Sequence, residues 1–276
     1  LRFRADVPKE RRQETLAQFE RQGIGAVSHP LYPDAFVLNG CEGVACLPGF
    51  AKGLFYVQDV SSMLAVEAAG ISPGMRVMDL CASPGGKALL AAEKTGDKGR
   101  VLAGDVSEAK TERISENARR MGCSNLEVRV WDAAKKQPDL KEWADVVLAD
   151  VPCSGLGVLG RKKEIRYRVQ PGDLAALSKL QRKILAASAD CVKPGGVLLY
   201  STCTVNRGEN EENVRFLTEK LGFERESLDP WLPECLHSRE TKDGCCQLFC
   251  GEYDTDGFFM ARLRRKGKQQ EKGWEK

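Results

Sequence analysis

The sequence predicts an α/β protein: a parallel sheet covered by helices on both faces, preceded by a small α+β appendage. From about residue 54 onward, short apolar segments alternate with amphipathic helical segments, which is typical of such a sheet. The segment ADVVLAD (144–150) is nearly all apolar, as expected of a strand buried on both faces. Residues 1–50 lack this alternation and place prolines and glycines between short apolar pieces, which indicates a separate small unit.

Local signals predict each element in turn. The predicted helices cover residues 9–23, 58–70, 87–96, 107–122, 174–196 and 210–222. The predicted strands cover residues 75–80, 100–105, 126–132, 144–150, 197–202 and 257–264. Gly23 and Gly70 end the first two helices, because glycine readily adopts the backbone that closes a helix. Pro194 is followed by two glycines, and we expect this triplet to end the fifth helix.

The composition is that of a globular protein and excludes several other classes. Hydrophobic residues make up 42% of the 276 residues, and no apolar run approaches the roughly 20 residues that span a bilayer. The opening segment LRFRADVPKERR lacks the apolar stretch of a signal peptide. We therefore expect a cytoplasmic monomer that does not contact membranes. Because the chain starts at Leu1 rather than Met, we also expect further residues upstream.

The chain contains eleven cysteines, which is a high number. It is long enough to form a core without disulfide bonds, and with no secretion signal we expect reduced thiols. Cys235, His237, Cys245, Cys246 and Cys250 lie close in sequence, but no C-x-x-C pair occurs among them. We therefore expect no metal site there.

Polar residues follow several predicted strands at the point where each strand ends. A glycine-rich turn, DLCASPGGK (79–87), follows the first strand, and Asp105 ends the second, 19 residues after Gly86. Asp132 and Asp150 end the third and fourth strands. One such aspartate is commonly a helix cap. Three of them at one sheet edge, after a glycine-rich turn, predict a site for a nucleoside-bearing cofactor.

Two cysteines also fall at this edge. Cys153 lies in DVPCSG after the fourth strand, and Cys203 lies in STCT after the fifth. A cysteine is often a small buried hydrophobic residue, and that interpretation suits Cys123 and Cys191. It suits Cys153 and Cys203 less well, because the ends of parallel strands face the ligand cleft. Two thiols beside a carboxylate indicate covalent chemistry.

These segments resemble the Sun (Fmu) family of RNA cytosine methyltransferases, which use S-adenosylmethionine. The similar segments are MDLCASPGGK, GDVSEAK, ADVVLADVPCSGLG, KPGGVLLYSTCTVNRGENEENV and TDGFFMARL, preceded by YVQDVSSMLA. The resemblance runs over about residues 50–264 and is weak before them. It is most specific at DVPCSG and STCT, since cysteines at these two places separate the family from other methyltransferases. It implies a Rossmann-like, S-adenosylmethionine-dependent methyltransferase sheet.

The resemblance also implies a role for each site residue. Cys203 is expected to attack carbon 6 of cytosine, Cys153 to assist breakdown of the covalent intermediate, and Asp150 to hydrogen-bond the cytosine edge. Asp105 is expected to bind the ribose hydroxyls and Asp132 the adenine amino group. The other residues expected to bind the cofactor are Cys81, Ala82, Ser83, Pro84, Gly85, Gly86, Lys87, Lys110 and Asp150.

We expect three parts in the chain: a small α+β appendage that binds RNA (1–52), a Rossmann-like methyltransferase catalytic domain (53–265) and a basic tail expected to be disordered (266–276). The basic segment RKKEIRYR (161–168) directly follows the DVPCSG turn, so we expect it to contact phosphates. The target base must leave its stack to react, which favours single-stranded or loop RNA.

The expected activity is methylation of carbon 5 of a cytosine in RNA, with small-subunit ribosomal RNA as the expected substrate. One alternative is the same chemistry on transfer RNA. A second is a non-catalytic RNA-binding assembly factor, which the presence of Cys203 and Asp150 disfavours. A third is a nicotinamide-dependent oxidoreductase, which the absence of a G-x-G-x-x-G motif disfavours.

Overall fold

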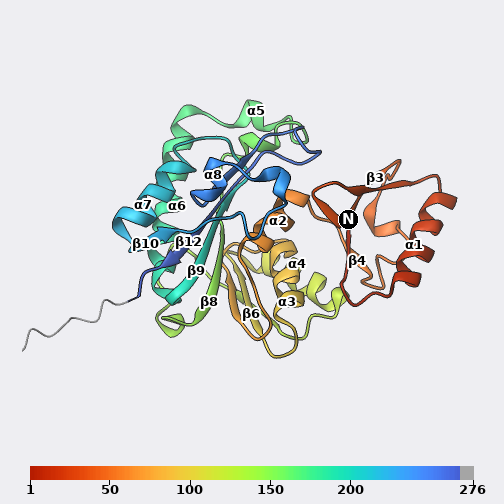
Figure 1. The fold of residues 1–276 in the computed structure, drawn as a ribbon, viewed down its shortest axis with the longest axis horizontal. Helices are drawn as coiled ribbons and strands as arrows, with labels where there is room; N and C mark the ends of the chain where they lie inside the picture. Colours follow the sequence, from red (N-terminus) through yellow and green to blue (C-terminus); the bar gives the residue numbers. More distant parts are fainter. Residues whose placement is uncertain (268–276) are drawn as a thin grey trace, which may run out of the picture.

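The computed structural model describes residues 1–267, and in this part of the chain two sheets form (Figure 1). A four-stranded sheet belongs to the amino-terminal unit, and an eight-stranded sheet belongs to the larger body. All but the first two residues of the predicted basic tail, 266–276, lie outside the described residues.

The larger sheet has the strand order β10-β12-β9-β8-β5-β6-β7, with β11 paired to β12. Its strands are β5 (Arg76–Asp79), β6 (Arg100–Asp105), β7 (Leu126–Val130), β8 (Ala144–Asp150), β9 (Val192–Thr202), β10 (Phe223–Arg225), β11 (Cys245–Leu248) and β12 (Phe258–Arg265). The pairs β5·β6, β6·β7, β5·β8 and β8·β9 are all parallel. The predicted Rossmann-like sheet is therefore confirmed.

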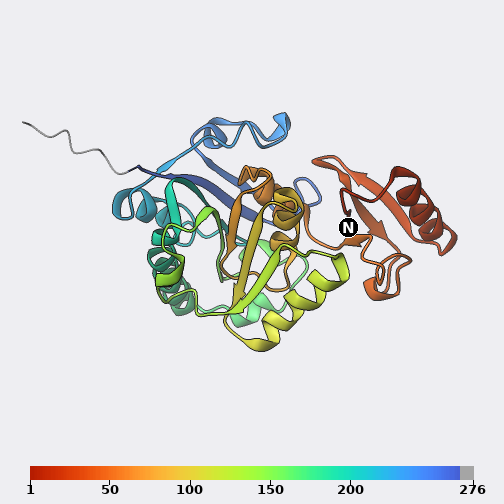
Figure 2. The same ribbon diagram turned by 90° about the horizontal axis from the view of Figure 1, so that it is seen from below.

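Helices cover both faces of this sheet (Figures 1 and 2). The helices of the larger body are α2 (Val60–Ala68), α3 (Gly86–Thr95), α4 (Glu108–Met121), α5 (Ile165–Arg168), α6 (Pro171–Ser188), α7 (Glu211–Lys220) and α8 (Arg239–Lys242). Successive strand residues alternate between the two cores: Val77 packs with α2, α3 and α4, whereas Met78 packs with α6 and α7. Among the described residues, no helix combines the length and the apolar character that crossing a membrane requires.

One edge of the sheet is antiparallel, which the alternating pattern did not predict. Strand β12 runs antiparallel to β9, and both β10 and β11 pair antiparallel with β12. Parallel neighbours need a crossover, usually a helix, whereas β11 and β12 are joined by residues 249–257 alone. The short connection turns the chain back on itself, so this last pair forms a hairpin.

Two predicted boundaries also differ from the structure. Helix α6 ends at Ser188, and β9 already begins at Val192, so the Pro194 triplet lies inside a strand. Pairing of Val192 with Ala144 of β8, across a register shift, extends the strand through this triplet. Strand β7 ends at Val130, which leaves Asp132 in the following loop.

The amino-terminal unit is a small sheet with one helix. Its elements are β1 (Arg2–Phe3), α1 (Lys9–Arg21), β2 (Gly25–His29), β3 (Tyr32–Asn39) and β4 (Phe55–Tyr56), in the strand order β2-β3-β1-β4. The Phe55 ring meets Phe3 and Phe19 edge to face, with ring centroids 5.7 and 5.8 Å away. Because β4 pairs with β1, this sheet reaches Tyr56, four residues past the boundary predicted at residue 52.

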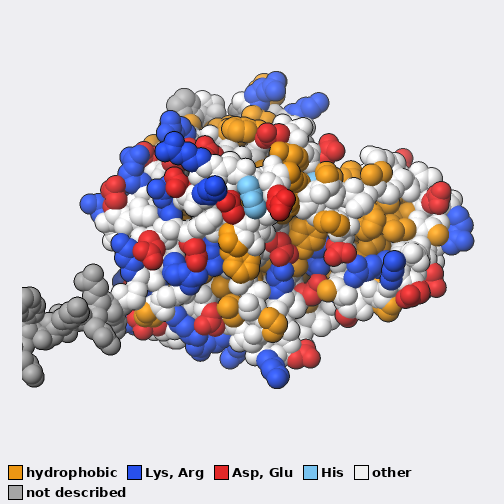
Figure 3. Space-filling model, in the orientation of Figure 1, with side chains coloured by type: hydrophobic (Ala, Val, Ile, Leu, Met, Phe, Trp, Pro, Cys, Tyr) orange, Lys and Arg blue, Asp and Glu red, His pale blue; other side chains and the backbone are white. Residues whose placement is uncertain are grey.

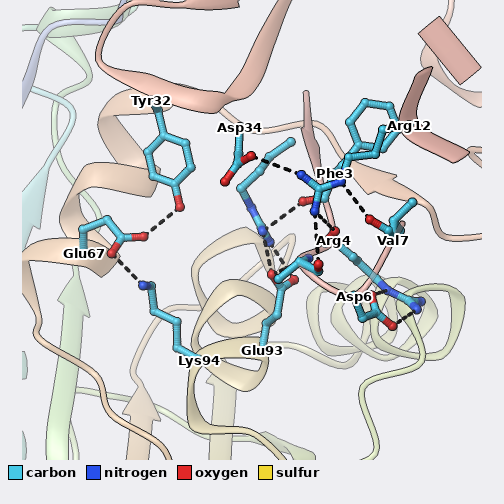
Figure 4. A network of polar contacts seen from close by, with 12 residues as sticks. Phe3, Arg4, Asp6, Val7, Arg12, Tyr32, Asp34, Glu67, Glu93 and Lys94 are labelled. Carbon is cyan, nitrogen blue, oxygen red and sulfur yellow. Dashed lines mark hydrogen bonds and ion pairs between the residues drawn. The ribbon is translucent and has the colours of Figure 1, made fainter. Parts of the chain in front are cut away.

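Polar contacts attach this unit to the larger body (Figure 4). The guanidinium of Arg2 is almost fully buried and donates two hydrogen bonds to Glu93 of α3, at 2.7 and 3.0 Å. Tyr32 donates to Glu67 of α2 at 2.7 Å, and Lys94 forms an ion pair with the same carboxylate. A buried guanidinium left without its carboxylate is costly, so these contacts hold the unit in one position beside α2 and α3.

Candidate active site

The carboxyl ends of the parallel strands β5 and β8 border a cavity of about 190 Å³. It is lined by six of the seven residues of the loop Cys81–Lys87, all but Gly85, and by Asp79 and Asp150. Residues 56–58 and Ser62 close the other side. The cavity therefore lies where ligands bind in open parallel sheets.

The loop needs its glycines for two different reasons. Gly85 has a positive φ of 113°, which side-chain-bearing residues rarely adopt. Gly86 starts α3, and a Cβ atom there would lie 3.0 Å from the Gln58 side chain and 3.1 Å from Tyr56. The backbone amides of the first helical turn thus meet the cavity without an intervening side chain.

Asp79 is the residue that the sequence reasoning missed. It ends β5, is 1% exposed and lines the cavity. Among the atoms that the structure describes, neither of its carboxylate oxygens has a hydrogen-bond partner. Burial raises the pKa of Asp79 from 3.8 to about 7. A buried acceptor pair of this kind indicates a ligand that donates hydrogen bonds. The position of Asp79 at a strand end, like that of Asp105, was the available signal.

Asp105 and Lys110 lie together beside the loop. The Asp105 carboxylate accepts hydrogen bonds from the Ser83 amide at 3.1 Å and from the Val106 amide at 2.8 Å. Lys110 reaches the same carboxylate at 2.9 Å. Asp105 is 5% exposed, so its contacts fix the turn Ser83–Gly85 against the end of β6.

Asp132 is placed differently from the other aspartates. Its carboxylate accepts a hydrogen bond from the Ala134 amide at 3.0 Å and lies 3.8 Å from the Lys135 ammonium. Like Asp105 and Lys110, it does not belong to the lining of the cavity. The neighbouring Trp131 packs against Gly104, where a Cβ atom would lie only 2.0 Å from the indole ring. The indole Nε1 donates to the Leu80 carbonyl at 2.8 Å.

Lys87 links the cavity to the fourth and fifth strands. Its ammonium lies 2.7 Å from one oxygen of Asp150 and 3.2 Å from the Ser62 hydroxyl. Burial disfavours the charge on Lys87, but the adjacent Asp150 outweighs it and raises the pKa of the ammonium. Ser201 donates to the second oxygen of Asp150 at 2.7 Å. The Asp150 carboxylate is therefore held by Lys87 at one oxygen and by Ser201 at the other. Ser201 lies two residues before Cys203 in the chain.

The two thiols at the sheet edge are in contact. The sulfur atoms of Cys153 and Cys203 lie 3.2 Å apart. The hydrogen bond from Cys153 lowers the pKa of Cys203, and Lys87 acts in the same direction. The same hydrogen bond, together with burial, raises the pKa of Cys153. The arrangement thus favours a thiolate at Cys203 and a thiol at Cys153.

The other cysteines have different surroundings. Burial raises the pKa of the Cys81 thiol well above its usual range, although Cys81 lines the cavity. Burial also raises the pKa of Cys123 and Cys191 to about 11. Thiols of this kind are inert packing residues at neutral pH.

The basic segment 161–168 lies against the turn that carries Cys153, but its residues differ in their contacts. Arg161 forms ion pairs with Asp59 and Asp256, at 2.8 and 3.1 Å. Lys162, Lys163 and Arg166 are exposed, as is Tyr167 at 79%. A Cβ atom on Gly155, two residues after Cys153, would lie 3.1 Å from Ile165 of α5, which places this segment against the DVPCSG turn. Figure 3 shows Lys and Arg side chains at the top of the molecule, where α5 lies in Figure 1.

Comparison with known protein families shows to which family this chain belongs. The family model described as 16S rRNA methyltransferase RsmB/F matches residues 69–264. The chain belongs to the RsmB/F family. This confirms the resemblance drawn from the sequence motifs. The matched range contains Asp79, the 81–87 loop, Asp150 and both thiols of the site.

A curated relative agrees with this assignment. The chain is 38% identical over 269 residues to a Bacillus subtilis protein named probable ribosomal RNA small subunit methyltransferase B. That match covers 96% of this chain and 60% of the relative. The chain therefore spans less than two thirds of the length of this family member.

Solved structures share the fold. A structure titled PH0851 is 32% identical in sequence to this chain, with a TM-score of 0.85. The match covers 95% of this chain and 57% of the PH0851 chain. The structure of NSun6 from Pyrococcus horikoshii with SFG is 30% identical in sequence to this chain, with a TM-score of 0.70. The match covers 82% of this chain and 56% of the NSun6 chain.

Proposed function

We propose that this protein methylates carbon 5 of a cytosine in small-subunit ribosomal RNA, with S-adenosylmethionine as the methyl donor. Membership of the RsmB/F family and the names of its relatives support an RNA methyltransferase. The observation that carries the cytosine chemistry is the Cys153–Cys203 contact of 3.2 Å beside the carboxylate of Asp150. Carbon 5 of cytosine is a poor nucleophile, and a thiolate added at carbon 6 activates it.

The residues around the cavity fit the cofactor. The unpartnered Asp79 carboxylate suits the ammonium of the methionine part, and the first-turn amides after Gly85 suit its carboxylate. Three further groups lie outside the cavity lining. Asp105, with Lys110 beside it, suits the ribose hydroxyls, and we assign Asp132 to the adenine amino group. When bound, S-adenosylmethionine supplies an electrophilic methyl group.

The protein groups then divide the work on the base. The Cys203 thiolate forms a bond to carbon 6, and the electron pair displaced from the ring makes carbon 5 nucleophilic. Asp150, oriented by Lys87 and Ser201, hydrogen-bonds the cytosine edge and stabilises the protonated ring. In the breakdown of the adduct a base accepts the carbon 5 proton. The electron pair of that C–H bond reforms the ring double bond as the bond from carbon 6 to the Cys203 sulfur breaks and releases the thiolate. Cys153, in contact with that sulfur, assists this step.

The exposed part of the basic segment suits the RNA strand. Lys162, Lys163 and Arg166 offer contacts to phosphates, and the exposed ring of Tyr167 offers a surface on which a base can stack. Arg161 is already committed to Asp59 and Asp256, so we exclude it from this role. We propose that the amino-terminal unit provides a second RNA-binding surface.

The decisive experiment is tritium transfer from labelled S-adenosylmethionine to RNA. We expect label in small-subunit ribosomal RNA, located as 5-methylcytosine by bisulfite sequencing. Label in transfer RNA alone would favour the alternative substrate. RNA binding without any transfer would favour a non-catalytic assembly factor and contradict the proposal.

Asp79→Asn is expected to weaken cofactor binding while stabilising the free protein at alkaline pH. The folded-state pKa of about 7 exceeds the ordinary value of 3.8, so the stability linked to Asp79 is present below pH 4 and is lost as the pH rises through 7. The shift of about three units corresponds to about 4 kcal/mol at pH 8, which the substitution should recover. Loss of the charged acceptor should weaken S-adenosylmethionine binding by about tenfold or more.

Calorimetric titration and thermal melts at pH 5 and pH 8 check this prediction. Asp145→Asn serves as the control, because Asp145 pairs with Lys193 away from the cavity, and its loss should leave cofactor affinity unchanged. Wild-type affinity in Asp79→Asn would show that the cofactor does not use this carboxylate.

A further inference from the structure

Glu209 is a buried carboxylate without an assigned role. It lies in the segment before α7 and is 0% exposed. One oxygen accepts from the Ser154 amide at 2.9 Å and from the Gln181 amide group at 2.8 Å. The other accepts from the Ser154 hydroxyl at 2.6 Å. Among the side chains that the structure describes, no Lys, Arg or His forms an ion pair with Glu209, and the donors named above are all neutral.

These contacts bind the segments on both sides of Cys153. Ser154 follows Cys153, and both its amide and its hydroxyl donate to Glu209. Pro152 precedes Cys153, and its carbonyl accepts from Gln181 at 2.9 Å. The same Gln181 amide group donates to Glu209. The backbone that carries the thiol of Cys153 is therefore attached to the carboxylate at two points.

The same group reaches the segment of Cys203. The hydroxyls of Ser154 and Thr204 lie 2.8 Å apart, and Thr204 follows Cys203. Both residues are buried. A single carboxylate thus joins the turn after β8 to the turn after β9, each at the residue next to its thiol.

The rest of the network keeps Glu209 itself in place. Asn213 of α7 donates to the Glu209 carbonyl at 3.0 Å and to the Gln181 side-chain carbonyl at 2.8 Å. Its amide group also reaches the Tyr200 hydroxyl at 2.9 Å. Gln181 and Asn213 are both 0% exposed, and α6, α7 and β9 each contribute to the network. A fully satisfied buried network of this kind fixes one arrangement of the elements it joins.

We infer that Glu209 is a positioning residue that sets the separation of the Cys153 and Cys203 sulfur atoms. It touches neither thiol by hydrogen bond and acts through Ser154 and Thr204. With the two turns held, Cys153 can donate to the Cys203 thiolate and keep it reactive at neutral pH. Without the carboxylate, the turns separate and Cys203 loses its donor. The inference deepens the proposed function, since it concerns the attacking thiol of the same site.

The test measures the reactivity of Cys203 without RNA or cofactor. Iodoacetamide alkylation is followed against pH, and peptide mass spectrometry reports Cys203 separately from the other cysteines. Glu209→Ala should raise the midpoint of the Cys203 profile by about one pH unit, as Cys153→Ala should, because each removes the donor. In Glu209→Gln the midpoint of the Cys203 profile should stay near the wild-type value. The side-chain oxygen of the glutamine still accepts from the Ser154 amide, and the Ser154 hydroxyl can accept from the new amide group instead of donating.

The thiol pair itself supplies the control. In a Cys153→Ala background, Glu209→Ala should cause no further shift, whereas a general loss of stability would act in both backgrounds. Glu226→Ala removes a carboxylate that pairs with Arg262 and Arg264, and should leave the Cys203 profile unchanged. If Glu209→Ala does not fold, Ser154→Ala breaks the same bridge and should shift the midpoint in the same direction.

Two results would overturn the inference: a wild-type midpoint in folded Glu209→Ala or Ser154→Ala, or an equal shift with and without Cys153. Because alkylation requires no RNA, a failure of the proposed methylation would leave this result intact. Conversely, methylation with unaltered thiol reactivity in the Glu209 variants would reject the inference and keep the proposed function.

Discussion

Cys203→Ala is expected to abolish methyl transfer to RNA, with a loss of about 10⁴-fold or more in rate. Without a thiolate at this position, no bond forms to carbon 6 and carbon 5 stays a poor nucleophile. Cys203 is the thiol whose pKa is lowered by the Cys153 hydrogen bond, so no other described cysteine offers the same reactivity at this edge. Tritium transfer from S-adenosylmethionine measures the loss.

The control for Cys203→Ala is Cys191→Ala. Cys191 is a buried thiol whose pKa is raised to about 11 by burial, and it lies directly before β9, at the opposite end of the strand from Cys203. Its removal should change stability but not the chemical step. Cofactor binding by Cys203→Ala should remain near wild type, because Cys203 does not line the cavity. Full activity of Cys203→Ala would reject the assigned nucleophile.

Cys153→Ala is expected to trap a covalent complex between the protein and methylated RNA. The attack by Cys203 can still occur, although at a higher pH, because the hydrogen bond that lowers its pKa is lost. Breakdown of the adduct lacks its assisting group and becomes the slow step. We expect a complex that survives denaturing electrophoresis and carries tritium from the cofactor, with turnover reduced by about 10²-fold or more.

The double variant Cys153→Ala/Cys203→Ala tests the origin of that complex. It should form no adduct, since the bond to carbon 6 needs the Cys203 sulfur. An adduct in the double variant would place the bond on another cysteine. Normal turnover by Cys153→Ala, with no adduct, would contradict the division of labour between the two thiols.

Much of the fold and part of the candidate site could be predicted from the sequence. The alternation of apolar strands with helices predicted the parallel order, because a strand buried on both faces must be almost entirely apolar. The glycine-rich loop 81–87 and the aspartates at strand ends were predicted to share one edge, because parallel strands bring their carboxyl ends together. The structure brings Asp79, Lys87 and Asp150 to one cavity there.

Other features could not be predicted because they depend on contacts between distant residues. The antiparallel β12 depends on a hairpin that the alternating pattern conceals. The Asp79 carboxylate has no described hydrogen-bond partner because of the residues that pack around it, and those neighbours are distant in the sequence. Glu209 looked like one of several acidic residues in RGENEENV, yet it is buried and accepts three hydrogen bonds.

The sequence by itself determined which residue types stand at each strand end, and therefore the class of chemistry: thiols, carboxylates and a glycine-rich loop at one edge. Only the tertiary structure decided how these groups act on one another. The two sulfur atoms are 50 residues apart in the chain and 3.2 Å apart in space. Hydrogen bonding and desolvation fall off over a few ångströms, so the pKa of each thiol follows from that distance and not from sequence spacing.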